Sequence, residues 1–280
     1  FVSIISPKPQ TTRDKILGIY TKNNTQFIFL DSPGIHNSTK IINQYMISEA
    51  VSTILDSDIV LFLVEFKSDF SFDEMEIKII KFLEKFNKNT ILILNKVDLS
   101  NNIKVDYENI IKYLENFKIF KDVIPLSAKK GVDTNLFLKQ IEKFIPNQQF
   151  FYPENYLTDR NDRFFVSEVI REKIFLLTFQ EVPYDSSVVV EKYNESKGSI
   201  VIDASIIVAK ESQKGVIIGK GGQNLQKIGM NARKDIEKHL NKKIILNLFV
   251  KVESNWNSNK DKLKQIGYEQ KDINIEEFLK

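Results

Sequence analysis

The stretch Thr90-Ile91-Leu92-Ile93-Leu94 followed by Asn95-Lys96-Val97-Asp98 decides the fold of this chain. Its first five residues are apolar and mostly β-branched, which predicts a short buried strand. Polar residues directly after such a strand lie at its carboxyl end, where open α/β sheets bind ligands.

The four polar-loop residues also suit one particular ligand. A carboxylate at Asp98 can accept two hydrogen bonds from the N1–H and 2-amino groups of guanine, whereas adenine would leave it unpaired. Asn95 can bond the base edge and a neighbouring loop, and the stem of Lys96 can cover the ring face. The stretch therefore predicts a guanine-reading loop, with a plain polar strand exit as the alternative.

Strands and helices alternate on both sides of this stretch. We expect strands over residues 15–21, 26–30, 58–65 and 123–126, and helices over residues 43–55, 74–86, 107–117 and 134–144. This alternation predicts an α/β fold with a mostly parallel sheet and helices on both faces.

A second polar loop, Asp31-Ser32-Pro33-Gly34, follows the strand over residues 26–30. The acid can hold a hydrated Mg²⁺ at a strand end, and Gly34 lets its backbone N–H approach a phosphate closely. A simple turn begun by an aspartate is the alternative interpretation.

Together these loops resemble a known class. Asp31-Ser32-Pro33-Gly34, Asn95-Lys96-Val97-Asp98 and Ser127-Ala128 match, in order, the phosphate-sensing, guanine-specificity and base-backing motifs of translation-factor-class GTPases. Thr11-Thr12-Arg13 resembles the switch I signature of the subgroup that contains the Era and Der GTPases. The fold that this implies is a P-loop-type GTPase domain.

The resemblance implies GTP and Mg²⁺ as cofactors. Thr11 or Thr12 would reach the metal together with Asp31, and Ser127-Ala128 would offer a backbone N–H to guanine O6. Ile35 replaces the water-positioning Gln of Ras-like enzymes, which implies slow intrinsic hydrolysis. The implied catalytic residues are Thr11, Thr12, Asp31, Gly34 and Ile35, and the implied GTP-binding residues are Asp31, Ser32, Pro33, Gly34, Ile35, Asn95, Lys96, Val97, Asp98, Ser127 and Ala128.

One motif of the class, Gly-x-x-x-x-Gly-Lys-Ser/Thr, does not occur in these 280 residues. The class places it before the Thr-Thr-Arg loop, so we expect an N-terminal truncation, with a degenerate relative that binds no nucleotide as the alternative. The motif's strand is central in the sheet of the class, so two neighbouring strands would lack a partner. Without the phosphate cradle we expect little or no GTP affinity, and whether this chain is an enzyme stays open.

The second half follows a Pro- and aromatic-bearing, aperiodic stretch, residues 148–158, that we interpret as a linker. We expect a helix over residues 159–179 capped by Asp159, strands over 186–192, 199–209 and 243–252, and helices over 224–228 and 230–240. The element order is α-β-β-α-α-β.

Gly219-Lys220-Gly221-Gly222 stands between an apolar run and a helix in this order. It resembles the Gly-x-x-Gly loop of a type II KH domain, which clamps about four nucleotides of single-stranded RNA. A glycine-rich helix start or a phosphate loop for a small ligand is the alternative. The expected RNA-binding residues are Ile218, Gly219, Lys220, Gly221, Gly222, Lys227, Arg233 and Lys234.

Bulk properties agree with an RNA-binding second half. Residues 201–250 carry nine Lys and Arg against four Asp and Glu, whereas residues 51–100 carry six against nine. The chain has no cysteine, which excludes disulfides and thiolate metal sites. No apolar run reaches the roughly 18 residues that span a bilayer.

A GTPase domain followed directly by a KH domain resembles the Era family; Der GTPases, with two GTPase domains and no Gly-x-x-Gly, are the alternative. The implied domains are a truncated GTPase domain over 1–147, a linker over 148–158, a KH domain over 159–254 and a tail over 255–280. We expect Trp256 and Tyr268, beyond the last strand, to pack against the KH sheet, with base stacking as the alternative.

The resemblance also implies partners and a role. The protein would bind small-subunit ribosomal RNA near its 3′ end and assist maturation of the 30S-type subunit; a nucleotide-independent RNA-binding assembly factor is the alternative. We expect a monomer without DNA binding and with at most peripheral membrane association. A cytoplasmic location is expected, with the inner membrane surface or an organelle as alternatives.

Overall fold

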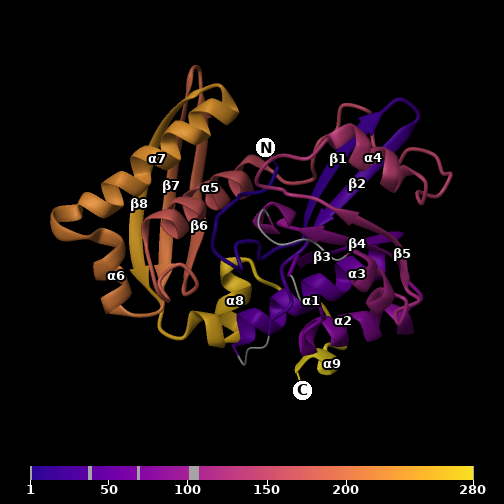
Figure 1. Cartoon of the computed structure of the whole chain (residues 1–280). Helices are drawn as coiled ribbons and strands as arrows, with labels where there is room; N and C mark the ends of the chain where they lie inside the picture. Colours follow the sequence, from indigo (N-terminus) through magenta and orange to yellow (C-terminus); the bar gives the residue numbers. More distant parts are fainter. Residues whose placement is uncertain (1, 37–39, 68–69, 101–106, 280) are drawn as a thin grey trace.

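The computed structural model describes residues 2–36, 40–67, 70–100 and 107–279. Two units, each built on its own three-stranded sheet, meet along a central seam (Figure 1). The first unit holds the expected GTPase motifs and the second holds the glycine-rich loop.

The sheet of the first unit is parallel, in the order β3 (Ile59–Glu65), β4 (Asn89–Asn95) and β5 (Phe120–Pro125). Strand β4 is buried on both faces. Ile91 and Ile93 pack in one core with α4 (Thr134–Glu142), while Leu92 and Leu94 pack in another with α2 (Glu74–Lys85) and α3 (Tyr107–Leu114). This two-sided burial explains why the strand is a continuous apolar run.

Strands β1 (Ile16–Lys22) and β2 (Thr25–Asp31) form a separate antiparallel hairpin around the turn Asn23-Asn24. Among the described residues, β2 and β3 have no sheet partner on the edges that face each other. A cavity of about 1310 Å³ separates them and is lined by side chains such as Phe29 and Leu61. The missing pairing between β2 and β3 agrees with the expectation that two neighbouring strands of the first unit lack a partner in the sheet.

The second unit has the predicted order α-β-β-α-α-β. Its sheet runs β6 (Ser186–Ser196), β7 (Ser199–Val208) and β8 (Lys243–Val252), with β6 antiparallel and β8 parallel to the central β7. Helices α5 (Asp162–Leu177) and α7 (Gln223–Leu240) cover one face of this sheet (Figure 1). Val169, Ile170 and Ile174 of α5 are buried there, as their helical spacing predicts.

Two expectations for the helices beside the glycine-rich loop are wrong. Helix α6 (Glu211–Ile218) precedes the loop, where only an apolar run was expected, and α7 is one continuous helix rather than two. Gly229 does not end α7: Ile228 and Ala232 on either side of it are buried in the core of the second unit, and a Cβ built at Gly229 would lie 3.4 Å from Leu248 Cδ1 of β8.

The predicted ends of α5 and α3 also need correction. Asn161, not Asp159, caps α5, because its side chain accepts a hydrogen bond from Phe164 N–H at 2.9 Å. Helix α5 ends at Leu177 rather than residue 179, because Thr178 is already extended. Helix α3 ends at Leu114 rather than residue 117.

The chain beyond β8 returns to the first unit. It contains a 3₁₀ turn η3 (Trp256–Ser258), α8 (Lys260–Ile266) and α9 (Glu276–Leu279). Trp256 and Tyr268 are buried against Ile207 of the second sheet, as expected, but equally against α1 (Ile41–Asp56). Ile275 and Phe278 continue this contact farther along α1. No helix in the described ranges combines the length and apolarity that crossing a membrane requires.

Candidate functional site: two loop clusters and a glycine-rich loop

The guanine-reading loops are tied together by side chains. We call residues 95–98 and 127–128 the base loops. Asn95 Oδ1 accepts hydrogen bonds from Lys96 N–H at 2.8 Å and from Ala128 N–H at 3.1 Å. Ser127 Oγ donates to Asp98 Oδ1 at 2.6 Å, and Val97 N–H donates to Leu126 O at 3.3 Å. The structure therefore brings all six expected base-side residues into one cluster.

Two charged side chains of the base loops, Asp98 and Lys96, each have a hydrogen-bonding partner. The hydrogen bond from Ser127 holds the pKa of the Asp98 carboxyl below its ordinary value, with Lys130 and Lys129 nearby adding to the effect. Lys96 Nζ lies 2.7 Å from Glu65 Oε2. Glu65 was not among the expected site residues, although it lies at the carboxyl end of β3 in register with Asn95, the kind of position where α/β sheets bind ligands.

The expected phosphate-side residues meet at the end of β2. Asp31 Oδ2 accepts a hydrogen bond from Ser3 Oγ at 2.7 Å. Partial removal from water raises the pKa of Asp31 above its ordinary value, and the neighbouring hydroxyls of Ser3 and Thr12 oppose the rise. The Thr11 hydroxyl points elsewhere, toward Ser6 Oγ and Lys8 O, both at 2.7 Å.

A small cavity of about 280 Å³ lies beside these residues and is lined by Thr11, Thr12, Ser32 and Gly34. Pro33 is buried. Ile35 packs against the apolar cluster of Ile47 and Val51. Within the described parts of the chain, no cluster of three or more His, Asp or Glu side chains could hold a metal ion. Asp31 and Thr12 thus provide a pair of oxygens rather than a full ligand set.

The loop Gly219-Lys220-Gly221-Gly222, called the GKGG loop below, joins α6 to α7 and is shaped by its backbone. Gly219 has φ 71° and ψ 175°, and a Cβ there would lie 2.8 Å from Asn224 Cβ. Gly221 and Gly222 also have positive φ, but a Cβ at either would meet nothing within 4 Å. The loop therefore exposes main chain that a nucleic acid backbone can approach.

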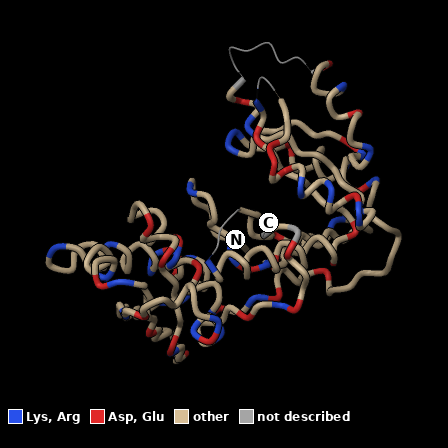
Figure 2. Tube along the Cα trace, turned by 90° about the horizontal axis from the view of Figure 1, so that it is seen from below, with Lys and Arg blue, Asp and Glu red and all other residues tan. Residues whose placement is uncertain are grey.

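Four exposed basic side chains lie in the GKGG loop (Lys220) and along α7, the helix that follows it (Lys227, Arg233 and Lys234). Within the described residues, Lys220, Lys227, Arg233 and Lys234 make no ion pair or hydrogen bond, and all four are exposed. Ile218 ends α6 and is partly buried. Acidic and basic residues are interspersed along the described trace of both units (Figure 2), so this free basic group is a local feature. Such a group can bind phosphates.

Comparisons with known proteins cover both units. A family model described as a 50S ribosome-binding GTPase matches residues 2–96, and a KH domain model matches residues 181–257. The GTPase Era of Geotalea daltonii is 41% identical over 272 residues, which are 96% of this chain and 89% of that protein. The GTPase Era of Lactobacillus helveticus is 40% identical over 276 residues, covering 97% and 89%.

Two solved structures have the same architecture. An Era variant from Aquifex aeolicus bound to GDP·AlF4⁻ is 32% identical, with a TM-score of 0.89 and coverage of 96% of this chain and 91% of that one. An Era in complex with MgGDPNP and nucleotides 1506–1542 of 16S ribosomal RNA is also 32% identical, with a TM-score of 0.90 and coverage of 96% and 90%.

Proposed function

This chain belongs to the family of Era GTPases, and from that membership we propose that it binds small-subunit ribosomal RNA near its 3′ end and assists maturation of the small subunit. The observation that carries the proposal is the open GKGG loop, followed by α7, with four basic side chains that make no ion pair among the residues the structure describes. A relative of matching architecture was solved with nucleotides 1506–1542 of 16S ribosomal RNA. The nucleotide-independent alternative is not favoured, because the relatives that match almost the whole chain are GTPases.

We propose GTP and Mg²⁺ as the ligands of the first unit when it is joined to the family's Gly-x-x-x-x-Gly-Lys-Ser/Thr segment, as in the relative solved with MgGDPNP. Asp98 keeps one carboxylate oxygen outside its bond to Ser127, which leaves it available to guanine. Asn95 and Lys96 would complete the base contacts, and Ala128 N–H, here bonded to Asn95, would be shared with guanine O6. When bound, Mg²⁺ would neutralise phosphate charge.

On the metal side we propose Asp31 and Thr12. Thr12 is close enough to Asp31 to lower the pKa of its carboxyl, whereas the Thr11 hydroxyl is engaged with Ser6 and Lys8. Ser32, Pro33, Gly34 and Ile35 would then form the adjoining phosphate-sensing turn.

We further propose a GTPase domain over residues 1–147, a linker over 148–158, a KH domain over 159–254 and a tail over 255–280. The linker runs beside the β1–β2 hairpin, where Gln26 Oε1 accepts hydrogen bonds from Phe151 N–H and Tyr152 N–H, both at 3.1 Å. We also propose that the protein is a monomer in the cytoplasm and that it binds the 30S-type subunit. The RNA that it would bind is located there.

The test is the RNA affinity of the whole 280-residue chain for an oligonucleotide of the 16S 3′ end, measured at two salt concentrations. We expect Lys220→Asp combined with Gly221→Asp to weaken binding at least about tenfold and to flatten the salt dependence, because carboxylates replace a phosphate contact. Both positions are exposed and a Cβ at Gly221 has open space, so the fold should survive.

A matched control is available on the hairpin turn between β6 and β7. Lys197→Asp combined with Gly198→Asp makes the same charge change at another Lys-Gly pair whose glycine has open space. It should leave RNA affinity nearly unchanged. Circular dichroism verifies both folds. If the folded GKGG variant binds RNA as tightly as the wild type, the loop is only a helix start and the proposal is wrong.

A further inference from the structure

Arg13, the third residue of the Thr-Thr-Arg signature, is buried in the second unit, with only 3% of its surface exposed. Its Nη1 donates to Ser186 O at 2.8 Å, and its Nη2 donates to Tyr184 O at 2.8 Å and to Pro183 O at 3.3 Å. These three carbonyls lie in the turn that leads from α5 into β6 and on the first residue of β6, a segment that we call the 183–186 turn. A residue of the nucleotide-side loop thus holds a turn of the RNA-binding unit.

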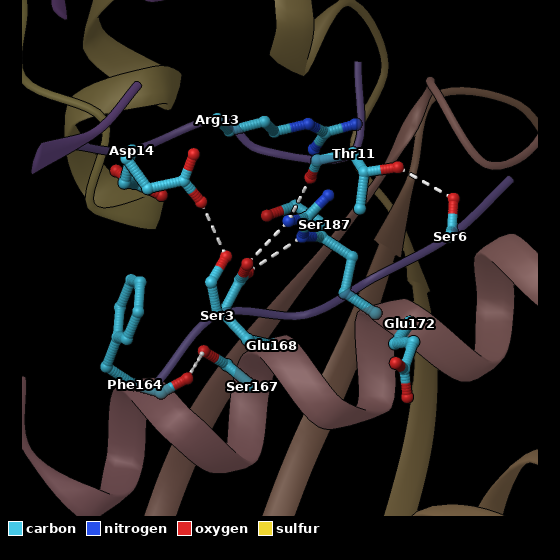
Figure 3. A network of polar contacts seen from close by, with 12 residues as sticks. Ser3, Ser6, Thr11, Arg13, Asp14, Phe164, Ser167, Glu168, Glu172 and Ser187 are labelled. Carbon is cyan, nitrogen blue, oxygen red and sulfur yellow. Dashed lines mark hydrogen bonds and ion pairs between the residues drawn. The ribbon is translucent and has the colours of Figure 1, made fainter. Parts of the chain in front are cut away.

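Two further cations tie the same loop to α5. Arg171 Nη2 donates to Thr11 O, and its guanidinium is held by Glu168, whose Oε1 lies 2.7 Å from Arg171 Nε. Lys8 Nζ donates to the carbonyls of Phe175 and Thr178 at the end of the helix. Figure 3 shows Thr11 and Arg13 above α5, with Glu168 on the helix below them. Residues 8–13 are therefore seated on the second unit.

The loop also contacts α1, the helix that follows the Asp31–Gly34 turn. Asp14 Oδ1 accepts a hydrogen bond from Tyr45 OH at 2.6 Å. The Tyr45 ring meets the Tyr268 ring edge-on at 5.3 Å, and Tyr268 OH lies 3.4 Å from Arg13 Nη1. Asp14 and helix α1 of the first unit thus meet Arg13 through the Tyr45–Tyr268 pair.

The 183–186 turn is bonded on its other side to the helix that carries the GKGG loop. Gln213 of α6 is 1% exposed, and its Nε2 donates to Asp185 Oδ2 at 3.1 Å. Asp185 Oδ1 accepts from Asn257 Nδ2 and pairs with Lys40 Nζ, both at 2.7 Å. An unbroken series of contacts leads from Arg13 through the turn to Gln213 and α6.

The hydrogen-bonding groups at the contact between Arg13 and the 183–186 turn favour two states of this contact, formed or broken. Buried carbonyls must keep a hydrogen-bond donor, and the planar fork of an arginine can serve three of them at once. If residues 8–14 left the turn, Tyr184 O and Ser186 O would lose the Arg13 donor together and would need water instead, whereas Pro183 O would keep the hydroxyl of Ser186. We therefore expect two discrete arrangements of the loop, docked and undocked.

We propose that Arg13 is a positioning residue that couples the Thr11–Thr12 loop to RNA binding at the GKGG loop, with the 183–186 turn and Gln213 as the relay. This inference rests on the proposed RNA-binding function. Coupling between two sites is reciprocal, so RNA bound at the GKGG loop should stabilise the docked loop, and release of the loop should change how α6 presents RNA contacts.

Hydrogen exchange of the whole chain, with and without the RNA of nucleotides 1506–1542, tests the proposal. In the wild type, RNA should slow exchange at residues 218–228 and also, about fivefold or more, at residues 8–14. In Arg13→Ala the response at 218–228 should remain while the response at 8–14 disappears. Arg13→Lys should not rescue it, because a compact ammonium lacks the planar fork whose two Nη atoms reach separate carbonyls.

Gln213→Ala removes the hydrogen bond from Gln213 to Asp185 at the other end of the relay. This variant tests the proposal if Arg13→Ala does not fold. It should also abolish the RNA response of residues 8–14. Arg163→Ala is the matched control: it removes an arginine of α5 that instead contacts Val190 O and the Tyr193 ring, so both responses should persist.

Three outcomes are distinguishable. An RNA response at 218–228 without one at 8–14 in the wild type overturns the coupling and leaves the proposed function standing. A response at 8–14 that persists in the folded Arg13→Ala and Gln213→Ala variants also overturns it. No response at 218–228 in the wild type overturns the proposed RNA site, and the coupling with it.

Discussion

The base loops and the GKGG loop are built in opposite ways. In the base loops, side chains hold one another, as when Ser127 bonds Asp98 and Asn95 bonds the amide of Ala128. In the GKGG loop, glycine backbone conformations set the shape, and the Lys220 side chain makes no bond within the described residues. Side-chain changes should therefore damage the first site through its chemistry, and backbone changes should damage the second through its shape.

The largest effect should come from Asp98→Asn. We expect it in a chimera that adds the Gly-x-x-x-x-Gly-Lys-Ser/Thr segment of an Era relative, which provides the phosphate cradle for measurable nucleotide binding. Guanine affinity should fall about 100-fold or more, because a site built for two hydrogen bonds strongly rejects a mismatched edge. Xanthine affinity should rise, because the amide donor matches the carbonyl that replaces the guanine amine.

Competition between GTP and XTP, followed by calorimetry, measures this change. The 280-residue chain without the added segment serves as the reference and should bind GTP no tighter than about millimolar, since base contacts alone must offset the entropy of binding. Unchanged selectivity in the chimera would mean that Asp98 does not read the base.

The second effect concerns the backbone of the GKGG loop. Gly219→Ala should destabilise the loop by roughly 1–3 kcal/mol, because the conformation of Gly219 is essentially reserved for glycine and a Cβ there meets Asn224. RNA affinity should fall about tenfold. Gly221→Ala is the matched comparison: its αL conformation and open surroundings limit the cost to about 1 kcal/mol. Equal losses in the two variants would contradict backbone control of the loop.

The smallest effect should follow from Ser127→Ala. The pKa of Asp98 should rise toward its ordinary value, because the hydrogen bond from Ser127 is the main cause of its depression. A carboxyl with a depressed folded-state pKa stabilises the fold above its unfolded pKa, and this contribution is lost as pH falls through the folded value. The free energy of unfolding of the variant should thus be slightly lower than that of the wild type near neutral pH and equal to it in strong acid.

Carbon-13 NMR titration of the side-chain carboxyls measures this shift. Asp56, whose pKa is depressed mainly by its hydrogen bond from Lys15, is the internal control and should titrate as in the wild type. An Asp98 pKa that does not move in Ser127→Ala would show that the base loops are held by other contacts.

Most of the fold could be predicted from local patterns. The buried run over β4, the alternation around it and the helical spacing in α5 each reflect burial on a regular element, which a sequence records directly. Helix boundaries at the GKGG loop were harder to predict, because Gly229 is a helix breaker by propensity, yet α7 continues through it with Ile228 and Ala232 buried in the core of the second unit.

Within the candidate site, the order of the motifs along the chain predicted which loops would lie together. It did not predict the hydrogen bonds that connect these loops. The sequence by itself determined the two units, their element types and the glycines of the GKGG loop. The periodicity of apolar residues identifies helices and strands, and positive φ angles favour glycine. Only the tertiary structure decided that Arg13 enters the 183–186 turn and that Tyr268 joins α1 to it. Those partners lie far apart along the chain, and the groups that Arg13 binds are main-chain carbonyls, which every residue carries and no sequence pattern reveals.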